Sequence, residues 1–222
     1  DDVKKHVKDD VLFTKSGNPV RSSIKRMDKD KAREIMGLDP DIFTILIFGG
    51  SQGALNVNKY IAKRAQSWTH KYKIQILWQT GDISYDMLCQ QFCDHRSIHL
   101  LPFIENMSAA YSAADMVIAR AGALTLAEVE LMKVPAILVP LPTAAGNHQY
   151  HNAKALAVLG CAHIVEESSF QDNPMIGYLK KMIQNPEYLR NMASKFPVRE
   201  DNADEIIARD ILEELKNIFA WS

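Results

Sequence analysis

A glycine-rich run, Gly49 to Gly53, separates an apolar stretch of strand length from a segment of helical character. Glycine permits a tight turn and a close approach of the backbone to a ligand. The start of the following helix offers unpaired N–H groups and the positive end of its dipole. Ser51 adds a hydroxyl and an amide donor, with Gly50 and Gln52 as secondary candidates. The run predicts a phosphate site, but it also fits a turn without a ligand, and its spacing matches neither the P-loop nor the dinucleotide fingerprint.

A second turn, Arg120 to Glu128, again joins a predicted strand to a predicted helix. Small residues at Gly122, Ala123 and Thr125 leave the start of this helix open, which suits a diphosphate. Glu128 follows within the helix, where its carboxylate could accept hydrogen bonds from the vicinal hydroxyls of a ribose. The alternative is a capping box formed by Thr125 and Glu128, which stabilises only the helix start.

A third loop, from Pro142, opens a helix that carries three polar candidates. Gln149 could hydrogen-bond sugar hydroxyls through its amide, and Asn152 lies one turn further along. His148 has the chemistry of a general base, but a histidine at this place also fits an ordinary surface residue.

Two further groups of residues have types that could bind a ligand. After a predicted strand, Phe103 and Ile104 lie at the edge of the sheet, where Ile104 either packs on a flat base or caps the core. Cysteine and histidine side chains, which can bind metals, occur at Cys89, Cys93, His95 and His99. Their spacing matches no common zinc pattern, so we expect no metal site there.

These turns belong to a regular alternation of elements. Apolar runs of strand length are 43–48, 73–78, 98–101, 116–119, 136–139 and 162–165, with a short strand at 11–14. Helical stretches are 28–36, 54–67, 84–92, 107–113, 124–132 and 148–159, followed by an interrupted helical region from 174 to the end. Strands that are apolar on both faces and alternate with helices indicate a parallel sheet covered on both sides. We therefore predict an α/β, Rossmann-like doubly wound fold, with ligands beyond the carboxyl ends of the strands.

The bulk composition excludes several other classes of protein. The chain has 222 residues, 47% of them hydrophobic, and a formal net charge of −1, so it has a substantial core and no general affinity for nucleic acid. Three cysteines favour free thiols in a reducing compartment. No apolar run reaches the ~20 residues of a membrane span. The charged start, Asp1 to Lys5, lacks a methionine and reads as the middle of a longer protein.

Taken in order, the motifs resemble the C-terminal domain of the MurG glycosyltransferases of peptidoglycan synthesis. They are Asn18–Arg21, Gly49–Gly53, Phe103–Ile104 with Met107, Arg120–Thr125 with Glu128, and His148–Tyr150 with Asn152–Ala153. Those enzymes transfer N-acetylglucosamine (GlcNAc) from UDP-GlcNAc to undecaprenyl-diphospho-muramoyl-pentapeptide. The resemblance implies one half of a GT-B fold, inversion at the anomeric carbon, and no metal or other cofactor.

The same resemblance implies roles for individual residues in donor binding. Ile104 would read the uracil and Glu128 the ribose, while Arg21 would contact the donor near its leaving group. The diphosphate would lie among Ser51, Leu124 and Thr125, and the sugar against Ala123 and Gln149. Leu126 and Ala127 belong to the same binding segment; Gly50, Gln52, Phe103, His148 and Asn152 are secondary candidates.

The resemblance also implies a missing partner domain. We expect residues 1–40 to be a hinge and remnant of a preceding domain, 41–199 the UDP-GlcNAc domain, and 200–222 a helix that packs on the missing N-terminal domain. That domain would supply the acceptor site, the catalytic base and peripheral contact with the cytoplasmic face of the plasma membrane. The apolar stripe of the last helix is Ile206, Ile207, Ile211, Leu212 and Leu215. Three alternatives stay open: another GT-B UDP-sugar transferase, a UDP-GlcNAc 2-epimerase, and a nucleotide-sugar-binding subunit inactive alone.

Overall fold

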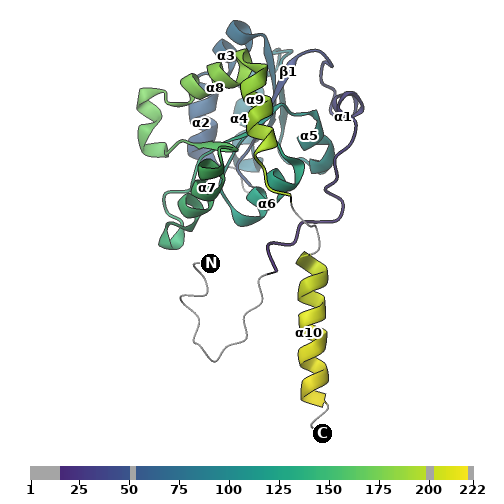
Figure 1. The fold of residues 1–222 in the computed structure, drawn as a ribbon. Coiled ribbons are helices and arrows are strands. Elements are labelled where there is room, and N and C mark those ends of the chain that lie inside the picture. The colour runs from purple at the N-terminus through teal and green to yellow at the C-terminus, as the bar shows by residue number, and fades with distance from the viewer. Residues whose placement is uncertain (1–15, 51–53, 199–202, 220–222) are drawn as a thin grey trace.

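Six parallel strands form one sheet in the computed structural model, which describes residues 16–50, 54–198 and 203–219 (Figure 1). The strands are β1 (Phe43–Phe48), β2 (Ile74–Gln79), β3 (Ile98–Leu101), β4 (Met116–Ala119), β5 (Ala136–Leu138) and β6 (Ala162–Ile164). Their spatial order is β3-β2-β1-β4-β5-β6, and each neighbouring pair is parallel. This is the order of a doubly wound sheet, so the predicted fold class is confirmed.

Helices cover both faces of the sheet. They are α1 (Lys29–Ile35), α2 (Leu55–Ala62), α3 (Ala65–Tyr72), α4 (Asp82–Phe92), α5 (Met107–Ala113), α6 (Ala123–Met132), α7 (His148–Leu159), α8 (Met175–Gln184), α9 (Pro186–Ser194) and α10 (Ala203–Phe219). Two short 3-10 helices, η2 (Ala145–Asn147) and η3 (Glu167–Asp172), complete the described elements. In Figure 1, α1 and α5 lie on one side of the sheet and α2 and α8 on the other.

Alternate residues of each strand enter two separate cores, as the pleat requires. Leu46 and Phe48 of β1 pack with α1, α5, α6 and α7, whereas Ile45 and Ile47 pack with α2, α3, α4, α8 and α9. Both faces of β1 are therefore buried, which explains its uninterrupted apolar sequence.

The predicted helix over 54–67 is wrong in its middle, where the chain forms two helices instead of one. Arg64 leaves helical geometry at φ −129°, and its N–H donates to the carbonyl of Ile61. Its guanidinium lies over the ring of Tyr60 and donates to Asn173. These contacts with a distant loop favour the break, and the local sequence does not reveal them. The predicted strand at 11–14 lies outside the described residues.

The segment before α1 is bound to helix α5 by a pair of serines. The N–H groups of Lys25 and Met27 donate to the hydroxyls of Ser108 and Ser112, each at 3.1 Å. One helical turn separates the two serines, so they present their hydroxyls on one face of α5. From Val20 onward the segment predicted as a hinge is thus packed on the body, and Val20 itself belongs to the core.

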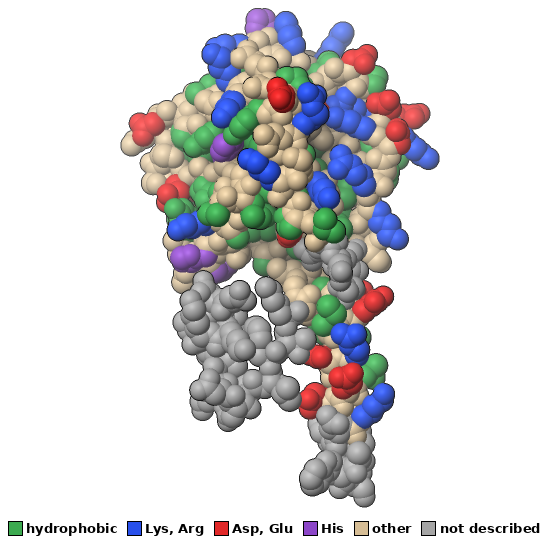
Figure 2. Space-filling view, in the orientation of Figure 1, with side chains coloured by type: hydrophobic (Ala, Val, Ile, Leu, Met, Phe, Trp, Pro, Cys, Tyr) green, Lys and Arg blue, Asp and Glu red, His purple; other side chains and the backbone are tan. Residues whose placement is uncertain are grey.

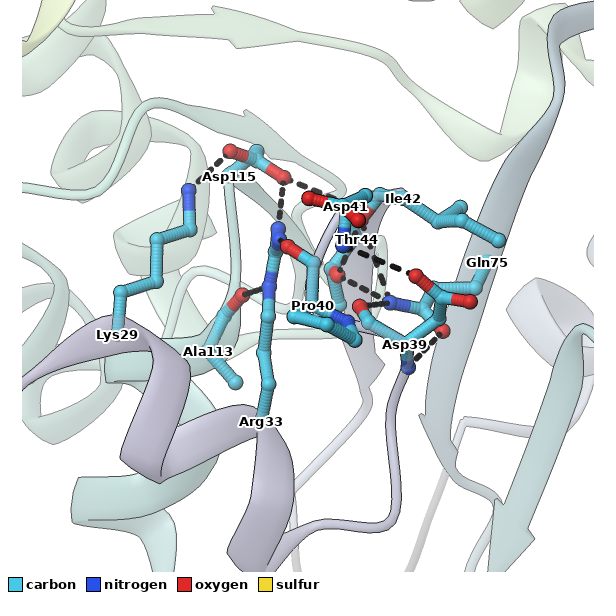
Figure 3. A network of polar contacts seen from close by, with 10 residues as sticks. All are labelled: Lys29, Arg33, Asp39, Pro40, Asp41, Ile42, Thr44, Gln75, Ala113 and Asp115. Atoms are coloured by element: carbon cyan, nitrogen blue, oxygen red, sulfur yellow. Dashed lines mark hydrogen bonds and ion pairs between the residues drawn. The ribbon is translucent and has the colours of Figure 1, made fainter.

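A polar network fixes α1 at the amino ends of the strands (Figure 3). Asp115, just before β4, accepts hydrogen bonds from the N–H of Thr44 at 2.7 Å and from Arg33 at 2.8 Å, and it pairs with Lys29. Arg33 also donates to the carbonyl of Ala113. The network joins α1, β1 and β4 at the end of the sheet opposite to the carboxyl ends of the strands.

Helix α10 extends away from the rest of the described chain (Figure 1). Hydrophobic side chains alternate with charged ones along its visible surface (Figure 2). Ile211, Leu212 and Leu215, which we predicted to form part of an apolar stripe, are 42–57% exposed. No helix within the described residues is long and apolar enough to cross a membrane.

Candidate ligand site at the carboxyl ends of the strands

The strand order reverses direction between β1 and β4, and the loops that follow these two strands border an open hollow. Its volume is about 560 Å³. Its lining combines the three turns that the sequence singled out with the start of α2: Gly49, Gly50, Ala54, Leu55, Asn56, Arg120, Gly122, Thr125, Leu141 and Gln149. A crevice at this switch point is where doubly wound sheets bind their ligands. Ser51, Gln52 and Gly53 lie outside the described residues.

The glycine turn is held by a buried glutamine at the end of β2. Gly50 has φ +90°, a conformation that side chains with a Cβ rarely adopt. Its carbonyl accepts a hydrogen bond from Nε2 of Gln79 at 3.0 Å, and Oε1 of Gln79 accepts one from the N–H of Ile104 at 2.9 Å. Gln79 is only 3% exposed. One side chain therefore fixes the ends of the loops after β1 and β3 relative to each other.

Ile104 itself belongs to the core. The residue is 1% exposed, and its side chain packs in the same cluster as Tyr111. The side chain of Ile104 therefore caps the core, and its predicted contact with a base stays a prediction. Phe103, immediately before it, is 51% exposed and presents the apolar surface at this edge.

The start of α6 is open toward the hollow. Gly122 occupies the N-cap position without a side-chain hydrogen bond, and the first intrahelical bond runs from Leu126 N–H to the Gly122 carbonyl. The N–H groups of the preceding helical residues have no partner within the helix. Ala123 and Leu124 are exposed there, whereas Leu126 and Ala127 are buried. The side chains of Leu126 and Ala127 face the core, and both residues line a separate hollow of about 380 Å³.

Glu128 has two described partners, and neither is Thr125. Its Oε2 accepts a hydrogen bond from the Tyr111 hydroxyl at 2.9 Å, and its Oε1 lies 3.6 Å from Nη2 of Arg21. The capping-box alternative is wrong, because α6 begins at Ala123 and Thr125 is already inside it. Burial, and next the neighbouring Glu128 carboxylate, raise the pKa of Tyr111 well above its usual value. Tyr111 therefore stays protonated and is the donor in this hydrogen bond.

Gln149 and Asn152 bind the loop that follows β4. Oε1 of Gln149 accepts hydrogen bonds from the N–H groups of Ala121 at 3.2 Å and Leu141 at 3.0 Å. Nδ2 of Asn152 donates to the carbonyl of Ala121 at 3.3 Å. The carbonyl end of Gln149 thus has a structural role, and its NH₂ group is the part that can donate to a ligand. His148 is exposed, with Nδ1 2.8 Å from the Ala145 carbonyl.

A buried ion pair at the hollow gives Arg120, the first residue of the second turn, a partner that the sequence did not predict. Arg120 donates to the carbonyls of Val139 and Pro140, and it forms an ion pair with Glu167 of η3. The other oxygen of Glu167 accepts a hydrogen bond from Asn56 at 2.6 Å. The network joins the loop after β4 to the start of α2. One signal for Arg120 was available in the sequence, because it is a charged residue directly after an apolar strand. Nothing in the sequence indicated that Glu167 lies beside it.

The cysteine and histidine group that we weighed as a metal site is spread over ordinary contacts. Cys93 donates to the carbonyl of Gln90, and His95 lies edge-on to Phe92 and contacts Thr69. In the part of the chain that the structure describes, no three residues of metal-binding type are grouped to hold an ion.

Comparison with known proteins decides the family. The model of the glycosyltransferase family 28 C-terminal domain matches residues 44–209, which is well over half of the chain. This chain belongs to the glycosyltransferase family 28 C-terminal domain family. The match begins at the second residue of β1 and includes every described element from α2 to α9, and with them the residues that line the hollow at the switch point.

Individual relatives agree with the family assignment. A UDP-N-acetylglucosamine–N-acetylmuramyl-(pentapeptide) pyrophosphoryl-undecaprenol N-acetylglucosamine transferase of Desulforamulus reducens is 39% identical over 193 residues, covering 84% of this chain and 51% of the relative. The crystal structure of Acinetobacter baumannii MurG is 32% identical with a TM-score of 0.67, covering 90% of this chain and 57% of that chain. The family 28 domain thus spans about half the length of these relatives, and the predicted assignment to one half of a GT-B fold is confirmed.

A more distant structure shares only the fold. The UDP-GlcNAc 2-epimerase of Neisseria meningitidis has a TM-score of 0.62 at 15% identity, covering 83% of this chain and 49% of that chain.

Proposed function

We propose that this chain binds UDP-GlcNAc and is the donor-binding part of a transferase that moves GlcNAc to an undecaprenyl-linked muramoyl-pentapeptide in peptidoglycan synthesis. The observation that carries the proposal is the hollow at the switch point, lined by three predicted ligand turns, in a chain of glycosyltransferase family 28. The donor and the acceptor are those in the names of the relatives.

The start of α6 is the proposed diphosphate site. UDP leaves with two negative charges, and donors that are already oriented toward this charge stabilise it without reorganisation. The open N–H groups of α6 and the glycine turn at Gly50 supply such donors, and the side chain of Arg21, 61% exposed, adds a positive charge. We propose that this arrangement needs no metal ion and no other cofactor, and that direct displacement inverts the anomeric carbon.

Three further contacts place the rest of the donor. Glu128 receives the ribose hydroxyls, and the NH₂ group of Gln149 donates to the sugar. Because Ile104 is buried, the exposed ring of Phe103 beside it supplies the apolar surface on which the uracil packs. The roles of Glu128 and Gln149 are those that the sequence implied, whereas Phe103 shares the uracil contact predicted for Ile104, and all of these roles are proposals. Ser51, which the sequence analysis places at the diphosphate, and the secondary candidate Gln52 lie outside the described residues.

Transfer requires more protein than this chain contains. Since the chain spans about half the length of its relatives, we propose that it binds the donor without turnover when it is alone. The acceptor site, the catalytic base and the peripheral contact with the cytoplasmic face of the plasma membrane belong, in this proposal, to the other half. Closure of two domains on both substrates also excludes water.

Calorimetric titration tests donor binding directly. We expect this chain to bind UDP-GlcNAc in preference to UDP-glucose, ADP-glucose and NAD, and we expect Glu128→Ala to weaken binding at least tenfold. Glu130→Ala, two residues further along α6, is the matched control and keeps wild-type affinity. Preferential binding of ADP-glucose or NAD would refute the proposal.

Reconstitution with the N-terminal half of a relative separates the remaining alternatives. Transfer of labelled GlcNAc to the lipid-linked acceptor supports the transferase. Donor binding without transfer supports a binding subunit, and formation of UDP-N-acetylmannosamine supports an epimerase.

A further inference from the structure

Tyr111 contacts both β1 and α6, the strand and the helix next to the glycine turn and the Gly122 turn that line the hollow. It comes from α5, is 1% exposed, and donates its hydroxyl to Oε2 of Glu128. Its ring meets that of Phe48 edge-on, with centroids 5.8 Å apart and planes at 86°. Phe48 is the last residue of β1 and directly precedes the glycine turn. The tyrosine ring is thus held by the strand while its hydroxyl holds a carboxylate of α6.

The two partners of Glu128 differ in how firmly they hold it. Tyr111 is enclosed in the core, and a phenol that donates to an ionised carboxylate makes a charge-assisted bond. Arg21 is 61% exposed and 3.6 Å away, which makes it a weak surface ion pair that a ligand can rearrange. Tyr111 therefore sets the orientation of the carboxylate.

Glu128 keeps capacity for a ligand after this bond is made. A carboxylate has about four acceptor positions, and a phenol hydroxyl fills one of them. The Glu128 side chain is 15% exposed, so it is partly open to solvent at this position. A vicinal diol needs two acceptors in a fixed relation, and free rotation of the carboxylate would make that arrangement less frequent.

We propose that Tyr111 is a positioning residue that fixes the carboxylate of Glu128 for the vicinal diol of a ribonucleotide. This inference rests on the proposed function. It predicts that the hydroxyl of Tyr111 contributes to the preference for ribose over deoxyribose, although it touches no part of the nucleotide.

The test is Tyr111→Phe, which removes one oxygen and keeps the ring. Calorimetry with UDP and with 2′-deoxy-UDP should show about a tenfold loss of affinity for UDP and less than a twofold change for 2′-deoxy-UDP. Tyr72→Phe is the matched control, because the Tyr72 hydroxyl is buried and has no hydrogen-bond partner among the described residues. It should leave both affinities unchanged.

A double variant shows whether the effect passes through Glu128. In the Glu128→Ala background, Tyr111→Phe should no longer change the affinity for UDP. An equal loss for UDP and 2′-deoxy-UDP, an unchanged affinity for UDP, or full additivity with Glu128→Ala would overturn the inference while leaving the donor site intact. If the wild-type chain bound UDP no better than ADP, the proposed function itself would fail, and the inference with it.

Discussion

Arg120 and Glu167 form an ion pair in which each side chain is only 11% exposed, and this pair closes the back of the candidate site. Arg120 follows β4 and Glu167 begins η3, so the pair joins segments 47 residues apart. Asn56 extends it to the start of α2. The loop that carries the open start of α6 is therefore attached to the helix behind the glycine turn.

Removal of one partner of this pair should be costly. Arg120→Met leaves the Glu167 carboxylate buried without its cation, and we expect a loss of about 3–5 kcal/mol in the free energy of unfolding. Urea denaturation measures this loss. The double variant Arg120→Met with Glu167→Met should recover most of the stability, since no unpaired charge stays buried. If the double variant is no more stable than Arg120→Met, the pair is not the cause.

Gln79 should matter for both stability and donor binding. Gln79→Leu leaves the Ile104 N–H and the Gly50 carbonyl without their partner, which we expect to cost about 1–3 kcal/mol. Because the glycine turn loses its support, affinity for UDP-GlcNAc should also fall. Gln91→Leu on α4 is a suitable control: the Gln91 side chain is exposed and, within the described part of the chain, donates only to the Ala62 carbonyl. Equal effects of the two substitutions would contradict the role given to Gln79.

The network in Figure 3 should affect stability without affecting the ligand site. The Arg33 side chain is 6% exposed and pairs with Asp115. Arg33→Met removes this buried cation, and we expect a loss of about 3 kcal/mol in the free energy of unfolding. Lys31→Met, on the exposed side of the same helix, should be nearly neutral. Since the network lies at the amino ends of the strands, the folded Arg33→Met variant should bind UDP-GlcNAc as wild type does. A large change in that affinity would show coupling across the sheet.

Histidine protonation should weaken the fold in mild acid. The ring of His163 is stacked on that of Tyr178, with centroids 4.0 Å apart, and its Nε2 lies 2.9 Å from the Tyr188 hydroxyl. Burial, and then Lys181, lower its pKa. The unfolded chain therefore takes up this proton first, so the stabilisation is present above the ordinary histidine pKa and is lost as pH falls through the lowered value.

Denaturation midpoints between pH 7.5 and 5 test this expectation. His163→Gln should lose stability less steeply over this interval than wild type, whereas His151→Gln, at an exposed position of α7, should follow the wild-type curve. His99, whose pKa burial also lowers, contributes the same trend in all three proteins. Parallel curves for all three would exclude His163 as a source of the pH dependence.

The sequence predicted the sheet well because its strands are apolar runs bounded by glycine, proline or charged residues. β1, β3 and β4 begin and end at the predicted residues, as do α5 and α7. Failures come where distant contacts decide the local structure. Arg64 interrupts a helical pattern because Asn173, more than a hundred residues away, accepts its hydrogen bond.

In the candidate site, too, the sequence predicted the residues that follow local patterns and missed those that depend on distant contacts. The turns at Gly50, Gly122 and Gln149 follow from strand–turn–helix patterns, and the structure brings them to one hollow. Gln79, Tyr111 and Arg120 support these turns from buried positions, and their partners come from other elements. No local pattern distinguishes Gln79 and Tyr111 from ordinary members of a strand or helix, and the only signal at Arg120 was its charge directly after an apolar strand. The outward orientation of Phe103 and the inward one of Ile104 likewise depend on packing.

The places where the chain enters and leaves the sheet domain are adjacent. A Cβ built on Gly17 would lie 4.0 Å from that of Ala203, and both residues line the same small hollow. A unit whose two connections lie side by side can be moved between larger proteins as a cassette, because neither junction has to be rerouted around the fold. Exchange of residues 17–203 with the matching part of a relative would therefore leave the path of the chain on either side of the exchanged part unchanged.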